Sequence, residues 1–262
     1  MSIQIKSDWW KSIFDELYLT TDARSIDNSK LTRFEVDQIE NAFGLKKDCS
    51  IVDLCGGQGR HALELSRRGF KNITVLDYSP VLLEKGYIQA KKENLNLKFV
   101  QSDARKTCLC SDYFDMVLIM GSSFGYFEKN AQNLLILKEV LRVMNPKGIL
   151  LLDLPDKQYV LDSFSSISKH QATDELWVKR DRQLISDVIF CKEQVYSKKK
   201  GCIRNNCYCT RLFSPEQITQ LLKQAGFSNI SIWKNFVNRE NEGDFGSMTN
   251  RMLVEARISR SI

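Results

Sequence analysis

Short apolar segments that predict β-strands alternate with segments of helical length through the first 155 residues. The predicted strands span residues 50–54, 73–76, 97–101, 116–120 and 149–154. Strands that alternate with crossover helices form a parallel sheet in α/β proteins. The hydrophobic pattern therefore predicts an α/β fold built on a parallel sheet.

The rhythm changes after Pro155. Two strand-like segments, residues 184–196 and 202–212, flank a lysine-rich turn at residues 198–201. Long strand-like runs around a short polar turn are typical of a hairpin. We therefore expect an antiparallel hairpin inserted after the fifth strand.

A helix and two strands complete the predicted fold. Ser214 and Pro215 are typical of an N-cap and a first helical position, and Gly226 ends that helix. The last two strands span residues 229–237 and 248–258. The polar, glycine-containing link between them suggests that this pair is antiparallel.

The N-terminal segment carries aromatic residues at helical spacing. Apolar residues at i, i+3, i+4, i+7 and i+8 predict an amphipathic helix over residues 8–18. The polar residues 20–30 predict a mobile loop, and residues 32–35 match a capping box that opens a helix ending near Gly44. The aromatic face either packs on the core or forms a lid that excludes water from a site.

Composition and charge narrow the function classes. The net charge of +6 is mild for 262 residues, and the basic residues are interleaved with acids, so nucleic-acid binding is not indicated. No apolar run approaches the roughly 20 residues of a membrane span, and the N-terminus lacks the apolar segment of a signal peptide. Eight cysteines fit reduced thiols. We expect a cytoplasmic monomer or homodimer without a membrane partner.

The first predicted strand runs directly into a glycine-rich turn. Asp53 is followed by Leu-Cys, then by Gly56, Gly57 and Gly59, and a helical pattern begins. Glycines let the backbone approach a ligand, and the first amides of a helix point at it. Asp77 follows the second strand, about twenty residues after the first glycine. A carboxylate at this position accepts hydrogen bonds from ribose hydroxyls. The stretch therefore predicts a site for a nucleoside-bearing cofactor.

These motifs resemble those of class I S-adenosylmethionine-dependent methyltransferases, from about Thr32 to the C-terminus. The supporting motifs are Asp103-Ala104 after the third strand, Phe114-Asp115 before the fourth, Asn145-Pro146-Lys147-Gly148 before the fifth and Ala225-Gly226-Phe227 at the last helix end. The glycines alone also fit a dinucleotide fingerprint. Asp53, Asp103 and the antiparallel closing pair favour the methyltransferase family over a nicotinamide enzyme.

The resemblance implies a three-layer Rossmann-like fold whose seven-stranded sheet is mostly parallel, with its last strand antiparallel. We expect a single domain, since no Gly/Ser/Pro-rich linker divides the chain. Within it, residues 1–48 form a helical lid and residues 49–155 the cofactor-binding core. Residues 156–213 form a variable acceptor region with the hairpin, and residues 214–262 the closing helix and strand pair.

The resemblance also assigns residues to the donor, S-adenosylmethionine, which leaves as S-adenosylhomocysteine. Asp53 is placed at the methionine ammonium, and Asp77 at the ribose hydroxyls. The other donor-binding positions implied are Gly56, Gly57, Gly59, Tyr78, Asp103, Ala104, Met120 and Gly121. Tyr78 is expected to stack on the adenine, and Asp103 to accept from its amine.

Acceptor residues are expected on the N-terminal segment and in the loop after the fourth strand. These are Trp10, Tyr18, Arg33, Phe124 and Tyr126. Tyr126 is the first candidate for a catalytic group and His61 the second, although a tyrosine ring most often packs and a first-turn histidine can simply be buried. Methyl transfer relies mainly on alignment, and an amine that arrives neutral needs no strong base.

Within the family, the Gly-Arg-His helix start at residues 59–61 and the Ser-Phe-Gly-Tyr-Phe loop at residues 123–127 are similar to those of bacterial small-molecule and peptide N-methyltransferases. We expect methyl transfer to a small-molecule or peptide acceptor at nitrogen. The alternatives are an RNA or protein methyltransferase and a non-catalytic relative that binds cofactor or partner. A zinc site at Cys202, Cys207 and Cys209 is disfavoured, because the C-x4-C-x-C spacing lacks paired knuckles.

Overall fold

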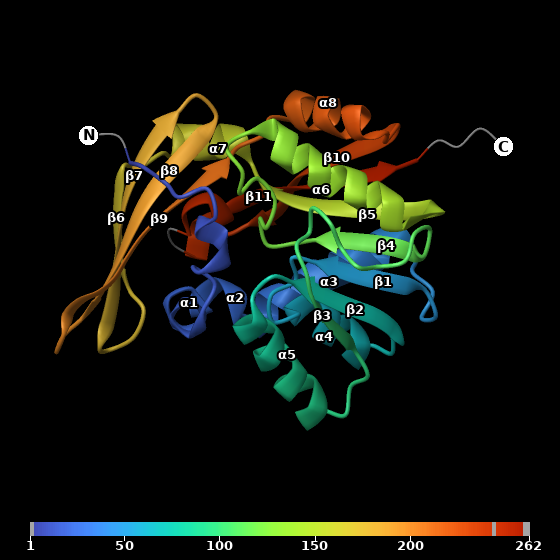
Figure 1. Ribbon diagram of the computed structural model, residues 1–262, viewed down its shortest axis with the longest axis horizontal. Helices are drawn as coiled ribbons and strands as arrows, with labels where there is room; N and C mark the ends of the chain where they lie inside the picture. The colour runs from blue at the N-terminus through green and yellow to red at the C-terminus, as the bar shows by residue number, and fades with distance from the viewer. Residues whose placement is uncertain (1–2, 243–244, 259–262) are drawn as a thin grey trace.

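Two β-sheets form the framework of the protein (Figure 1). The computed structural model describes residues 3–242 and 245–258. The larger sheet has seven strands in the order β10-β11-β5-β4-β1-β2-β3. They are β1 (Ser50–Leu54), β2 (Asn72–Asp77), β3 (Lys98–Gln101), β4 (Phe114–Ile119), β5 (Met144–Pro155), β10 (Asn229–Asn238) and β11 (Asn250–Arg257).

The strand directions confirm the predicted mostly parallel sheet. β1, β2, β3, β4 and β5 pair in parallel, whereas β11 is antiparallel to both β5 and β10. The fifth strand begins earlier than the predicted residues 149–154, because β5 already starts at Met144, which pairs with Phe114. An irregularity in that pairing absorbs the turn-forming residues, and regular pairing resumes at Ile149.

Helices cover both faces of the larger sheet (Figure 1). On one face lie α3 (Ser29–Phe43), α4 (Arg60–Arg67) and α5 (Pro80–Lys92), and on the other lie α6 (Asn130–Val143) and α8 (Pro215–Ala225). Strand residues alternate between the two cores: Ile51 packs with α3 and α4, and Val52 packs with α6. This alternation follows from the two-residue period of a strand.

The second sheet replaces the predicted hairpin. It is an antiparallel meander of β6 (Ile167–Gln171), β7 (Leu176–Ile185), β8 (Val188–Ser197) and β9 (Gly201–Arg211). The prediction of one strand over residues 184–196 is wrong, because the chain turns at Ser186, which has a φ of 52°. The short helix α7 (Lys157–Asp162) leads from β5 into this sheet.

The N-terminal segment lies between the second sheet and one end of the larger one (Figure 1). It contains η1 (Trp9–Lys11), α1 (Glu16–Thr21) and α2 (Ala23–Ile26). A continuous helix over residues 8–18 is therefore wrong, since Asp15 is extended and its side chain caps α1 by accepting from the Tyr18 amide at 2.9 Å.

Two further expectations for the N-terminal segment need correction. Residues 20–30 are not a loop, because α1, α2 and the start of α3 occupy most of them. The capping box at residues 32–35 is also wrong: α3 begins at Ser29, and the Asn28 side chain caps it by accepting from Leu31. Thr32 instead donates from within the helix to the Asn28 carbonyl. The expected helix end at Gly44 is confirmed.

The link between the final strands is folded locally. It contains η2 (Glu240–Glu242) and η3 (Gly246–Met248), which lie near the N-terminal segment (Figure 1). Among the described residues, no helix is long and apolar enough to cross a membrane.

Candidate functional site

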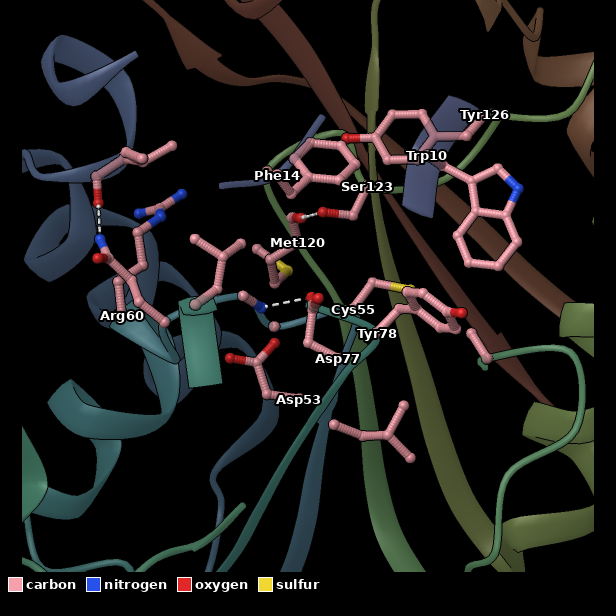
Figure 2. Close-up of a pocket in the computed structure, with 18 of the residues that line it drawn as sticks. Trp10, Phe14, Asp53, Cys55, Arg60, Asp77, Tyr78, Met120, Ser123 and Tyr126 are labelled. Carbon is pink, nitrogen blue, oxygen red and sulfur yellow. Dashed lines mark hydrogen bonds between the residues drawn. The ribbon is translucent and has the colours of Figure 1, made fainter. Parts of the chain in front are cut away.

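The carboxyl ends of β1, β2 and β4 meet beneath the N-terminal segment. They enclose a cavity, here called the strand-end cavity, which contains most of the predicted site residues (Figure 2). Its predicted lining residues are Trp10, Tyr18, Asp53, Gly56, Gly57, His61, Asp77, Tyr78, Asp103, Ala104, Met120, Gly121 and Tyr126. Ligands of open α/β sheets bind at this end of the strands. The cavity is therefore the candidate active site.

The glycine loop, residues 56–59, packs tightly against β2 and against Asp53. Gly59 is the N-cap of α4 with a φ of 72°, and a Cβ there would lie 2.9 Å from a methyl carbon of Val75. Gly56 lies against the acid that precedes the loop, because an added Cβ would come within 2.7 Å of the Asp53 carboxyl carbon. Larger side chains at either position would displace β2 or Asp53.

Asp53 is a buried carboxylate at the end of β1 that borders the cavity. Neither of its oxygens makes a hydrogen bond of normal geometry to a described residue. Burial raises the pKa of Asp53 to about 7, and the positive charge of Arg60 and the Ala62 amide only partly oppose this. A buried carboxylate in this state is unfavourable unless a ligand supplies a cation or donors.

Asp77 is held in a fixed orientation at the end of β2. One of its oxygens accepts from the Gly57 amide at 2.8 Å (Figure 2). The other accepts from the Ser79 amide, also at 2.8 Å. Burial raises its pKa, while these bonds lower it. Ser79 is the N-cap of α5 (Pro80–Lys92), and its hydroxyl also donates to the Phe14 carbonyl at 2.6 Å. That bond joins the N-terminal segment to the rim of the cavity.

At the other side of the cavity, Asp103 is paired with Arg105. Burial alone would raise the pKa of Asp103, but hydrogen bonds from Arg105, the closest at 2.6 Å, hold it below its ordinary value. The Arg105 guanidinium also lies 5.1 Å from the Trp10 ring and 4.8 Å from that of Phe127. Trp10 meets Tyr78 edge to face at 4.7 Å, and its indole nitrogen is buried without a partner among the described residues.

Aromatic side chains close the opposite end of the cavity near Met120 and Gly121. Tyr126 stacks on Phe14 with their ring centres 5.6 Å apart (Figure 2). Tyr18 meets Phe14 edge to face at 5.0 Å. Burial raises the pKa of both tyrosines well above the ordinary value. Both phenols are therefore protonated at neutral pH and can orient a substrate rather than act as strong bases.

A buried charge network supports the floor of the cavity. Glu35 of α3 accepts from Arg60, His61 and Arg251, and Arg251 also pairs with Asp153. The Glu35, Arg251 and Asp153 side chains are fully buried. Removing one member of such a group leaves an uncompensated charge and is strongly destabilising.

The network reaches the backbone of the candidate site. Asp153 accepts from the Gly121 amide at 2.8 Å, and burial raises its pKa to about 6 against the opposing effect of Arg251. An added Cβ on Gly121 would lie 3.7 Å from an Arg60 guanidinium nitrogen, so Arg60 lies beside this glycine. Burial lowers the pKa of His61 to about 4, so its ring is neutral at pH 7.

Two predicted acceptor residues do not line the strand-end cavity. Phe124 is buried in the core against Phe213, at a ring distance of 5.6 Å. Arg33 is exposed on α3. Arg60 and Phe14 line the cavity and Arg105 adjoins it, although no sequence motif assigns them a role there. Arg60 follows the glycine loop directly, and that position was the available signal.

The described residues contain no group of three or more His, Cys, Asp or Glu side chains that could hold a metal ion. The eight cysteines are all free thiols. Cys202, Cys207 and Cys209 are spread along β9, and Cys209 is buried beside the Tyr126 carbonyl.

Comparisons with known proteins identify the same region. Residues 51–148 match a family described as a methyltransferase domain. Over 220 residues the chain is 25% identical to a putative methyltransferase, YqeM, of Bacillus subtilis (strain 168), covering 81% of this chain and 85% of that protein. It is also 25% identical to a glycine/sarcosine N-methyltransferase of Aphanothece halophytica over 202 residues, covering 74% and 72%.

Solved structures share the whole architecture. A crystal structure of an S-adenosylmethionine-dependent methyltransferase from Clostridium acetobutylicum ATCC 824 superposes with a TM-score of 0.73 at 17% identity. The match covers 93% of this chain and 97% of that one. The likeness confirms the Rossmann-like architecture with its second antiparallel sheet.

Proposed function

We propose that this S-adenosylmethionine-dependent methyltransferase, of class I by its motifs and fold, methylates an amine nitrogen of a small acceptor. The observation that carries the proposal is the character of the groups beside Gly121. They are the partly buried phenols of Tyr18 and Tyr126, whose raised pKa values keep both protonated at neutral pH. An amine that arrives neutral needs no base at this position, whereas an alcohol acceptor would.

The residues of the strand-end cavity fit the cofactor. In this proposal Asp53 accepts from the methionine ammonium, which supplies the missing partner of its buried carboxylate. Arg60 lies beside Gly121 and pairs with the cofactor carboxylate. Asp77 accepts from the ribose hydroxyls, and the adenine lies between Tyr78 and Asp103.

The chemistry requires alignment and exclusion of water. When bound, S-adenosylmethionine would supply a methyl carbon on positive sulfur, which an amine lone pair could attack with S-adenosylhomocysteine as the leaving group. Trp10, Phe14 and Tyr18 cover the cavity and exclude competing water. The Tyr126 hydroxyl orients the acceptor, and precise alignment alone contributes several kcal/mol. His61 is a weaker candidate for catalysis, because its Nε2 is bonded to Glu35 at 2.9 Å.

The proposal is tested by measuring S-adenosylhomocysteine formation with a panel of primary and secondary amines and with alcohols of the same carbon skeletons. We expect turnover with amines and none with the matched alcohols. Turnover confined to alcohols or phenols would overturn the assignment to nitrogen.

Replacing Tyr126 with phenylalanine is expected to lower kcat by about three- to tenfold, the worth of one hydrogen bond near 1 kcal/mol. The affinity for S-adenosylmethionine should not change, because Tyr126 is assigned to the acceptor. Tyr113→Phe is the matched control, since this tyrosine is exposed at the far end of β4. Equal kcat values for Tyr126→Phe and the unmodified enzyme would remove Tyr126 from the mechanism.

Donor binding is expected to weaken as the pH falls through 7. The Asp53 carboxyl, with a pKa of about 7, becomes neutral below that value. An ammonium group binds the carboxylate better than the neutral acid. Affinity should therefore fall by up to about tenfold for each pH unit below 7. Calorimetry from pH 5.5 to 8.5 measures this, and a flat profile would contradict the role of Asp53.

A further inference from the structure

The strand-end cavity continues beyond the proposed transfer position. Tyr18, Tyr126 and Met248 line both this cavity and a second one toward the second sheet. That second cavity shares Asp22 and Arg180 with a third, which extends to α7 and residues 245–249. The second and third cavities are here called the inner chamber. The chamber provides room for the body of an acceptor.

A partly exposed aspartate lies at the near end of the inner chamber, on the side of the transfer position. The Asp22 carboxylate is one-quarter exposed and accepts from Arg180 at 2.9 Å. Arg180 also donates to the buried Glu193 at 2.8 Å, and Glu193 accepts from Arg204 at 2.9 Å as well. Asp22 is close enough to Tyr18 to help raise the pKa of that phenol. Asp22 can therefore accept a hydrogen bond from an amine near the two tyrosines.

The far end of the inner chamber contains a cation without a counter-ion among the described residues. Arg182 lies two residues after Arg180 on β7, on the same face of the sheet. Its guanidinium donates to the Ser168 hydroxyl at 2.8 Å and the Ser165 carbonyl at 3.3 Å. Glu240 lines the same chamber, but within the described part of the chain Arg182 forms no ion pair. A partly buried guanidinium in this state favours an anion.

We propose that the acceptor is an amine that also carries an anionic group, a carboxylate or a phosphate, and that Arg182 determines this specificity. The amine end lies beside Asp22, and the anionic end binds Arg182. This inference rests on the proposed methylation of amines and adds the second charged group of the acceptor. Neutral hydroxyl-bearing residues between the two ends, among them Thr210 and Ser247, suit a polar body.

Matched acceptor pairs test the inference. S-adenosylhomocysteine formation is measured with 6-aminohexanoate against 1-aminohexane, and with glucosamine 6-phosphate against glucosamine. We expect the anionic member of at least one pair to have a KM at least tenfold lower, and the two pairs separate carboxylate from phosphate. Arg182→Gln should raise the KM of the anionic acceptor at least tenfold, leave its kcat within about threefold, and leave neutral amines unaffected.

Lys179→Gln is the matched control, because it removes a cation from the opposite face of the same strand, where Lys179 pairs with Asp181. The Lys179→Gln change should alter the KM of neither the anionic nor the neutral acceptor. Equal use of anionic and neutral amines, together with an Arg182→Gln variant that matches the unmodified enzyme, would overturn this inference but leave amine methylation standing. A protein that binds S-adenosylmethionine yet methylates only alcohols would overturn the proposed function itself.

Discussion

Replacing Asp53 with asparagine is expected to stabilise the ligand-free protein and to remove most of its stabilisation by S-adenosylmethionine. Without a ligand, this carboxylate is buried and lacks a hydrogen-bond partner among the described residues, and its pKa is about 7 rather than the ordinary 3.8. One pKa unit corresponds to about 1.4 kcal/mol. Allowing for a buried amide that also lacks partners, we expect a gain in the free energy of unfolding on the order of 1–3 kcal/mol at pH 8.

The pH dependence fixes the sign of this effect. Because the folded chain holds the Asp53 proton more tightly than the unfolded chain does, the contribution of this group is most favourable below pH 4. It is lost as the pH rises through about 7. The Asp53→Asn variant has no such loss, so the difference between the two proteins should grow from pH 4 to pH 8.

Thermal and denaturant unfolding with and without S-adenosylmethionine measure both effects. The donor affinity should fall by about 10- to 100-fold, the loss expected for a hydrogen bond between charged groups. Asp37→Asn is the control, since Asp37 is an exposed carboxylate of α3 beside Arg68. A destabilised Asp53→Asn protein that still gains full stability from the donor would contradict the assignment of Asp53.

Replacing Arg251 with methionine is expected to lower the free energy of unfolding by about 3–5 kcal/mol. Methionine keeps much of the side-chain length but leaves Glu35 and Asp153 buried without the charge that they share. The same change should release the Gly121 loop, because Asp153 holds the Gly121 amide. Denaturant unfolding measures the first effect, and the KM for the donor measures the second.

Arg257→Met provides the comparison on the same strand. Arg257 pairs with Glu255 at 2.6 Å with a side chain 40% exposed, so its loss should change stability by less than about 1 kcal/mol. If both methionine variants lose the same small amount of unfolding free energy, the buried network does not support the fold as described.

The parallel core was predictable because its signals are local. Each of β1, β2 and β4 is a short apolar run, and period-two alternation assigns its residues to two cores. Ser214 and Gly44 were predicted correctly, because N-cap serines and left-handed C-cap glycines act within one helical turn.

The second sheet and the N-terminal segment were harder to predict because longer-range contacts decide them. The helical spacing over residues 8–18 is real, but Trp9 packs on Tyr208 and Trp10 on Tyr78, which separates η1 from α1. The turn at Ser186 carries no glycine or proline, so nothing local interrupts the strand pattern there.

The site residues likewise differ in how well local sequence predicts them. Asp53, Asp77 and Asp103 follow strand ends, so topology alone brings them together. Arg251 and Glu35 meet although they lie far apart in sequence, and no motif marks either residue. Arg182 resembles any other arginine of a strand until the structure shows that it lines a chamber without a carboxylate partner among the residues described.

The most direct test of the account is a calorimetric titration of the purified protein at pH 8 with S-adenosylmethionine and, separately, with NAD. The account predicts micromolar binding of S-adenosylmethionine to one site per chain, strongly weakened by Asp53→Asn, and no binding of NAD. Binding of NAD, or undiminished binding of S-adenosylmethionine by the Asp53→Asn variant, would contradict the placement of the cofactor in the strand-end cavity.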